Sequence, residues 1–161
     1  MKGIIICGYP GVGKSSVAGW DNCIDLESSS FWINGKRADD WYIPYGNIAM
    51  HLANQGYTVF TSSHKVVWSY LASLPLMENV GKVVIFCPTI KDKDAWITKL
   101  YERYKRTGLI KDYKALMNAN DRYEENILEL INSGLPIYQP KFYPYYDLLY
   151  YVNEARADWC K

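Results

Sequence analysis

The sequence predicts a three-layer α/β fold, in which a parallel sheet of about five strands carries helices on both faces. One observation favours this fold class, and a second favours a single globular domain. Short apolar runs alternate along the chain with longer stretches in which apolar residues recur at helical spacing, which is typical of βαβ units. The chain has 161 residues, of which 49% are hydrophobic and 22% charged, and this suits one globular domain better than a disordered segment. We therefore expect residues 1–161 to form a single domain.

Five short apolar runs are the predicted strands. They cover residues Gly3–Gly8, 23–26, Thr58–Ser62, 82–87 and 135–138. Gln55-Gly56 is a turn signal before the third strand, Pro88 ends the fourth, and Ser133-Gly134 introduces the fifth. Because helical stretches separate the strands, they are expected to run parallel, with a ligand crevice at their carboxyl ends.

Helical periodicity fills the segments between these strands. A helix-compatible stretch over residues 14–20 follows the first strand, but only seven residues separate Ser15 from the second strand, which shortens this helix. Residues 94–106 and 111–132 read as two helices with polar faces, broken at Thr107-Gly108. Apolar residues at helical spacing also precede the third and fourth strands: Tyr45, Ile48, Ala49 and Leu52, then Val66, Val67, Tyr70, Leu71 and Leu74.

The charge balance and the cysteines narrow the functional classes. Eighteen basic and seventeen acidic residues give a formal net charge of +1. This balance argues against strong sequence-independent binding to nucleic acid, although a local basic patch remains compatible with it. No apolar run approaches the roughly 18 residues of a transmembrane helix, so no membrane partner is expected. The cysteines form no C-x-x-C pair and are interpreted as reduced structural residues of a cytoplasmic protein. They are Cys7, Cys23, Cys87 and Cys160.

Residues 8–15, Gly-Tyr-Pro-Gly-Val-Gly-Lys-Ser, form the pattern G-x-x-x-x-G-K-S directly after the first strand. Between a strand and a helix this pattern predicts a phosphate-binding loop, because the glycines let backbone N–H groups converge on a phosphate and the helix N-terminus adds positive potential. Lys14 is expected to reach the β- and γ-phosphates of ATP, and the Ser15 hydroxyl is expected to ligate Mg²⁺. The expected nucleotide contacts are Gly8, Pro10, Gly11, Val12, Gly13, Lys14, Ser15 and Ser16.

Asp25 is the carboxylate that an apolar strand delivers to the crevice. The third strand ends in Ser62 and the fourth in Cys87-Pro88. Asp25 is therefore predicted to be catalytic and a metal ligand, either activating an acceptor hydroxyl or orienting the water molecules of magnesium. The alternative is a helix N-cap or a turn residue. Glu27 is interpreted as a solvated or capping residue.

The arrangement resembles the small P-loop kinase group, which includes adenylate, nucleotide, shikimate and gluconate kinases. In outline it is most similar to bacteriophage-type deoxynucleotide kinases. The resemblance implies the P-loop NTPase fold, with a helical lid over residues 91–122. Lids of this group present arginines to the transferred phosphates, which implies catalytic roles for Arg103 and Arg106 and a substrate contact for Arg122. The alternative is an ordinary charged helix face, since Glu102 and Arg106 have the spacing of an i,i+4 ion pair.

Acceptor recognition is expected from residues 27–55, between the second and third strands. Trp32 and Arg37 lie where aromatic and basic residues interleave, a pattern that suits a flat base with an attached phosphate. Trp41 and Tyr45 are interpreted as residues that pack their helix onto the sheet. His64, after the third strand, either hydrogen-bonds the acceptor or is a buried, satisfied histidine.

These expectations favour ATP-dependent phosphoryl transfer to a nucleotide or nucleoside, with ATP and Mg²⁺ as cofactors. Three alternatives stay open: a kinase that acts on a modified base in DNA, such as hydroxymethyluracil; a small-metabolite kinase; and a nucleotide-binding switch or scaffold without kinase activity. The arginine cluster favours an enzyme over the last of these, because a simple binding module does not need it. Neither the acceptor nor the oligomeric state follows from the sequence.

Overall fold

The computed structural model describes residues 1–17, 19–34, 36–141 and 147–161. Five parallel strands form one sheet in the order β2-β5-β1-β6-β7. These strands are β1 (Gly3–Gly8), β2 (Cys23–Asp25), β5 (Thr58–Ser62), β6 (Val80–Phe86) and β7 (Ile137–Tyr138). Each predicted strand is present with its ends moved by two residues at most. The α/β class with a five-stranded parallel sheet is therefore confirmed.

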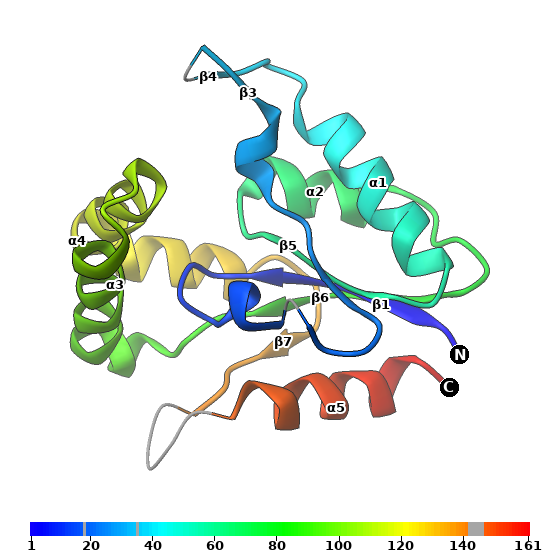
Figure 1. Ribbon diagram of the computed structural model, residues 1–161. Coiled ribbons are helices and arrows are strands. Elements are labelled where there is room, and N and C mark those ends of the chain that lie inside the picture. The colour runs from blue at the N-terminus through cyan, green and yellow to red at the C-terminus, as the bar shows by residue number, and fades with distance from the viewer. Residues whose placement is uncertain (18, 35, 142–146) are drawn as a thin grey trace.

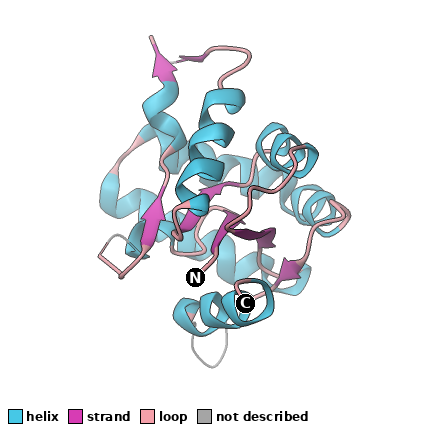
Figure 2. Cartoon of the chain, turned by 90° about the vertical axis from the view of Figure 1, so that its right-hand side faces the viewer, coloured by secondary structure: helices cyan, strands magenta, loops and turns pink. Residues whose placement is uncertain are grey.

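Helices cover both faces of the sheet (Figures 1 and 2). α1 (Tyr42–Asn54) and α2 (Lys65–Ser73) lie on one face, and α5 (Leu148–Trp159) lies on the other. Side chains of β1 alternate between the two cores, because successive residues of a strand point to opposite faces. Ile5 belongs to the core that contains residues of α1 and α2, and Ile6 belongs to the core that contains residues of α5. Burial on both faces explains why β1 is apolar throughout.

α3 (Lys93–Thr107) and α4 (Ile110–Ile131) form a helical pair beyond the carboxyl ends of the strands (Figure 1). A 3-10 turn, η3 (Ile90–Asp92), leads into α3. Gly108 ends α3 in the left-handed region, with a φ of 64°, at the break predicted for Thr107-Gly108. Arg122 has the non-helical angles φ −137° and ψ 23°, so α4 is kinked at this residue.

The helix expected over residues 14–20 is wrong in type and length. The structure has one 3-10 turn here, η1 (Lys14–Val17), and residue 18 lies outside the described residues. The chain has to turn back at Asn22, which has a φ of 58°, before it enters β2. Too few residues remain for a second helical turn, so η1 carries few aligned peptide dipoles.

Two further features are absent from the sequence-based prediction. The first is α5, whose buried residues Leu148, Val152 and Ala155 recur at helical spacing. The second lies between β2 and α1, where a 3-10 turn, η2 (Ser28–Phe31), precedes an antiparallel hairpin of β3 (Trp32–Ile33) and β4 (Lys36–Arg37). The hairpin projects from the rest of the molecule (Figure 1). No helix in the described ranges is long and apolar enough to cross a membrane.

Candidate functional site

The glycine-rich loop, residues 8–15, connects the central strand β1 to η1. Gly11 and Gly13 have φ values of 93° and 102°, which side-chain-bearing residues rarely adopt. A Cβ atom on Gly11 would also lie 2.9 Å from the Trp96 indole nitrogen of α3. Both the backbone conformation and the close approach of α3 therefore require glycine at position 11.

Several N–H groups of this loop have no partner within the described chain. Val12 N donates to the Tyr9 carbonyl at 3.1 Å, and Ser16 N donates to the Gly13 carbonyl at 3.0 Å. For the backbone N–H groups of Gly13, Lys14 and Ser15 the described residues offer no acceptor. Consecutive free N–H groups in such a turn form a concave site for an anion. Because η1 is so short, this site depends on the loop itself and on nearby cations rather than on an α-helix dipole.

The α3–α4 pair is attached to the glycine-rich loop. Trp96 donates its indole N–H to the Pro10 carbonyl at 2.7 Å, and Trp96 is fully buried. On the α4 side, the rings of Tyr9 and Tyr123 meet edge to face at a centroid distance of 5.9 Å. These contacts hold the helical pair against the loop.

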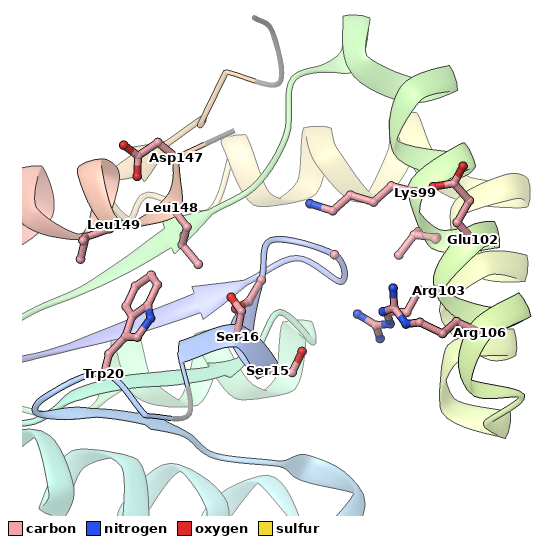
Figure 3. Close-up of a pocket in the computed structure, with 13 residues that line it drawn as sticks. Ser15, Ser16, Trp20, Lys99, Glu102, Arg103, Arg106, Asp147, Leu148 and Leu149 are labelled. Atoms are coloured by element: carbon pink, nitrogen blue, oxygen red, sulfur yellow. The ribbon is translucent and has the colours of Figure 1, made fainter. Parts of the chain in front are cut away.

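Two cavities open on either side of the loop. The first, of about 480 Å³, lies between the loop, α3 and the start of α5 (Figure 3). The second, of about 670 Å³, lies between the loop, the strand ends, η2, the hairpin and α4. Ser15, Arg103 and Arg106 line both cavities. The two cavities therefore meet beside the glycine-rich loop.

Lys14 and Asp25 lie in the wall of the second cavity. Burial lowers the pKa of Lys14, and the negative charges of Asp25 and Glu27 oppose this shift. Burial likewise raises the pKa of the Asp25 carboxyl, against the opposing effect of Lys14. Asp25 is the last residue of β2, so the strand-end position predicted for it is observed. Its raised pKa is the direction expected for a carboxylate that accepts a proton.

The residues expected to hold magnesium, Ser15 and Asp25, both line the second cavity. Within the described ranges no cluster of three or more His, Cys, Asp or Glu side chains could bind a metal ion alone. Mg²⁺ is usually held by one or two protein oxygens together with phosphate oxygens and water, and this residue pair fits that pattern.

The three candidate arginines have different environments. Arg103 donates to Asp112 from Nε at 2.7 Å and from Nη2 at 2.5 Å. Arg106 is exposed, lines both cavities and has no ion pair with Glu102 or any other described carboxylate, so the proposed i,i+4 pair does not form. Figure 3 shows the side chains of Arg103 and Arg106 extending from α3 toward the loop. Arg122 pairs with Glu125 at 3.0 Å and lines neither cavity, so it stands apart from the other two.

Asp112 joins the two helices of the pair. It is 2% exposed and also accepts a hydrogen bond from the Thr107 hydroxyl at 2.5 Å. Although desolvation opposes the change, the hydrogen bonds from Thr107 and Arg103 lower the pKa of Asp112. Arg103 is therefore held by a charged partner at the α3–α4 turn.

Arg37 and Trp32 lie on the hairpin wall of the second cavity. Arg37 donates from Nη2 to the Ser28 hydroxyl at 3.0 Å, and its guanidinium carbon lies 4.4 Å from the Trp41 ring centroid. Trp32 carries cations on its ring: Arg37 at 5.2 Å and Lys114 of α4 at 4.7 Å. Its buried indole N–H has no hydrogen-bond partner among the described residues.

Trp41 and Tyr45 pack as interpreted from the sequence. Tyr45 is fully buried, donates its hydroxyl to the Leu26 carbonyl at 2.6 Å and accepts the backbone N–H of Ser62 at 2.9 Å. It thus connects the ends of β2 and β5. Trp41 is 9% exposed and lies against Tyr45.

His64 lies on the cavity wall with its ring edge-on to Trp41 and its Nδ1 hydrogen-bonded to the Ser62 hydroxyl at 2.9 Å. Desolvation lowers the pKa of His64 to about 4, and the charges of Arg37 and Lys14 act in the same direction. The ring is therefore neutral at pH 7. Its side chain keeps solvent access, so it is not the fully buried histidine of the alternative reading.

Glu27 caps η2, because its side chain accepts the Ser29 N–H at 3.2 Å. It also forms an ion pair with Lys111 of α4, with 2.9 Å between Nζ and Oε2. The capping interpretation is therefore confirmed, and the ion pair links α4 to the segment after β2.

Several residues that line the cavities were not predicted from the sequence. In the first cavity these are Trp20, Lys99, Leu148 and Leu149. In the second they include Lys111, Lys114, Asn118 and Asn126, all on α4. Asn126 donates to the Asn118 amide oxygen, and eight residues of straight helix would separate these side chains by about 12 Å. The kink at Arg122 brings them together, and the sequence carries no proline or glycine that would signal it.

No protein-family model matches the chain, and no curated protein matches it either. Its function is therefore inferred from the geometry and chemistry of the site.

Proposed function

We propose that this protein is an ATP-dependent phosphotransferase of the small P-loop kinase type. The observation that carries the proposal is the meeting of two cavities at Ser15, Arg103 and Arg106. They meet beside a glycine-rich loop in which several N–H groups have no acceptor among the described residues. A kinase needs two sites that share one point, because donor and acceptor must both reach the transferred phosphate.

In this proposal the donor nucleotide occupies the first cavity. Its phosphates bind the free N–H groups of Gly13, Lys14 and Ser15, with the Lys14 ammonium on the β- and γ-phosphates. Ser15, and Asp25 through a water molecule, would hold magnesium, which would supply positive charge for the β- and γ-phosphate oxygens. Trp20 and Leu148 offer apolar surface for the base at the far end of this cavity.

The acceptor, a nucleotide or nucleoside, occupies the second cavity. An acceptor oxygen attacks the γ-phosphorus, the bond to the β–γ bridging oxygen breaks, and ADP leaves with that electron pair. Where the attacking group is a hydroxyl, Asp25 takes its proton or orients a water molecule that does so. A kinase acting on a base in DNA, or on a small metabolite, would use the same parts with a different acceptor.

The α3–α4 pair acts as the lid in this proposal. Trp96 attaches the pair to the loop through Pro10, and Arg106 extends from it to the junction of the cavities. Positive charge at this point stabilises the transferred phosphoryl group, and a closed helical pair excludes the water that would hydrolyse ATP.

Two measurements test the proposal. ATP with Mg²⁺ should raise the melting temperature of the wild-type protein, and phosphoryl transfer should appear in a screen of nucleotides, nucleosides, single-stranded DNA and small hydroxy acids. Lys14→Ala should abolish transfer and leave the fold intact, because Lys14 belongs to neither hydrophobic core. Lys105→Ala, which removes an exposed cation that lines neither cavity, is the matched control. Absence of any nucleotide-dependent shift in the wild type would overturn the proposal.

A further inference from the structure

The second cavity has an excess of positive charge that the whole chain, at +1, does not share. Seven lysine and arginine side chains and four carboxylates line it. Three of these carboxylates are already paired: Glu27 with Lys111 at 2.9 Å, Asp112 with Arg103 at 2.5 Å, and Glu129 with Lys65 at 3.9 Å. Four cations then face one remaining carboxylate. The cations are Lys14, Arg37, Arg106 and Lys114, and the carboxylate is Asp25.

These four cations divide between the two ends of the cavity. Lys14 belongs to the glycine-rich loop, and Arg106 lines both cavities, so these two serve the transferred phosphate. Arg37 and Lys114 line the second cavity but not the first. They approach the Trp32 ring from the hairpin and from α4, at 5.2 and 4.7 Å from its centroid. Arg37 and Lys114 thus form a second cationic centre, outside the cavity in which the proposal places the donor nucleotide.

Arg37 is held in a fixed position, and none of the described carboxylates forms an ion pair with it. The Ser28 hydroxyl accepts a hydrogen bond from Arg37 Nη2 at 3.0 Å, and the Ser28 carbonyl accepts one from Arg37 Nε at 3.5 Å. The centroid of the Trp41 ring lies 4.4 Å from the guanidinium carbon. Within the described chain no carboxylate lies within 4.0 Å of the Arg37 nitrogens. Glu27, whose charge reaches Arg37, is occupied by Lys111. A guanidinium has five donors, so several stay available to a ligand.

A half-buried guanidinium without a carboxylate partner is costly unless an anion completes it. Two indole rings and two bonds to Ser28 orient the group in advance, which reduces the entropy lost when it binds a planar pair of anionic oxygens. Arg37 lies over both the Trp32 and the Trp41 rings, and Lys114 also lies over the Trp32 ring. The Trp32 ring therefore binds positive charge rather than offering an open face to a base.

We propose that the acceptor itself carries a phosphate, and that Arg37 with Lys114 binds this phosphate during transfer. The inference rests on the proposed kinase function and narrows its substrate class. A nucleoside or a neutral polyol is excluded as the main acceptor. The phosphate belongs either to a nucleoside monophosphate or to the backbone of single-stranded DNA, and both present the same anionic oxygens to Arg37.

Matched acceptors test this inference in the wild-type protein. Each nucleoside monophosphate is compared with its nucleoside, and a single-stranded oligonucleotide with both, at saturating ATP. We expect efficient transfer only to the phosphate-bearing acceptors, and competitive inhibition against the acceptor by inorganic phosphate. Activity with monophosphates alone assigns the phosphate to a mononucleotide, and activity with the oligonucleotide alone assigns it to a DNA backbone; either result supports the proposal.

Variants then locate the contact. Arg37→Gln should raise the KM of the acceptor about 10- to 100-fold, the factor expected for lost hydrogen bonds to a charged group. Arg37→Lys should raise this KM less, because it keeps the positive charge. Lys114→Gln should shift the same KM in the same direction. Lys36→Gln, next to Arg37 on the hairpin but exposed and outside the cavity, is the control. Melting temperatures show whether each variant is folded. If Arg37→Gln does not fold, the acceptor KM of Lys114→Gln and the inhibition of the wild-type protein by phosphate decide the question.

Two kinds of failure are distinguishable. Equal kcat/KM for nucleosides and their monophosphates, or an unchanged acceptor KM in folded Arg37 and Lys114 variants, would overturn this inference while the kinase function stands. Absence of ATP binding and of transfer to every acceptor would overturn both.

Discussion

Replacing Arg103 or Arg106 by alanine is expected to have two different effects, although both side chains line both cavities. Arg103→Ala leaves the carboxylate of Asp112, 2% exposed, with Thr107 as its remaining side-chain partner. Breaking a buried ion pair costs about 3–5 kcal/mol, and the lower value applies because the Arg103 side chain is 30% exposed. At about 2–4 °C per kcal/mol for a chain of this size, the melting temperature should fall by roughly 6–12 °C.

Arg106→Ala should leave stability almost unchanged, within about 0.5 kcal/mol, because the side chain is exposed and forms no ion pair with a described carboxylate. Its effect should appear in catalysis. Loss of a cation at the junction of the cavities is expected to lower phosphoryl transfer by roughly 10- to 10³-fold, while the ATP affinity changes much less. The assay therefore combines thermal unfolding, ATP titration and a single-turnover transfer rate for both variants, with Lys105→Ala as the control.

The opposite pattern would refute this assignment. If Arg106→Ala transfers phosphate at the wild-type rate, the exposed face of α3 is only solvated and the pair does not act as a lid. If Arg103→Ala keeps the wild-type melting temperature, Thr107 and water satisfy Asp112 and the ion pair is not what joins α3 to α4.

Two other predictions concern the walls of the second cavity. Asp25→Asn keeps the shape of the side chain and removes its charge, so kcat should fall by roughly 10²-fold or more if the carboxylate accepts a proton or orients magnesium; a near-wild-type kcat would make Asp25 structural. His64 has a pKa of about 4 in the folded chain against an ordinary value of 6.5, so the unfolded chain binds an extra proton between these values. The free energy of unfolding should therefore decrease as the pH falls from about 6.5 toward 4, and it should decrease less in His64→Gln. Urea unfolding of both proteins at pH 7 and at pH 5 measures this, and an equal loss of stability in the two proteins would contradict it.

The strands and the glycine-rich loop are predictable because their signals are local. β1 is buried on both faces, so every residue in it is apolar, and the conformations of Gly11 and Gly13 follow from a pattern within eight residues. The break at Gly108 is equally local, since one residue in the left-handed region ends the helix. In the same way, the seven residues between Ser15 and Cys23 indicated a shortened helix, but they did not indicate that the α-helix would be replaced by a single 3-10 turn.

The charge partners were not predictable, because each depends on contacts between distant segments. Arg103 has Glu102 beside it in the sequence, yet its partner is Asp112, which the turn at Gly108 folds back onto α3. Lys111 pairs with Glu27, which is 84 residues away. Two-residue strands such as β3 and β4 are too short for periodicity to reveal them, so the position of Arg37 beside Ser28 was hidden as well.

The shortness of η1 changes where the positive potential at the loop comes from. A four-residue 3-10 turn supplies little of the dipole that a full helix would direct at a phosphate. Side chains of α3 make up for it: Lys99, Arg103 and Arg106 all line the first cavity, at spacings of four and three residues that place them on one face. Burial lowers the pKa of Lys99 to about 8, and the charge of Arg103 acts in the same direction. Because Trp96 on the same helix bonds to Pro10, the charges of α3 are held in register with the loop N–H groups. In the proposed kinase, therefore, α3 performs two tasks that are usually separate, since it provides the anion-stabilising charge of the missing helix and it covers the transferred phosphate.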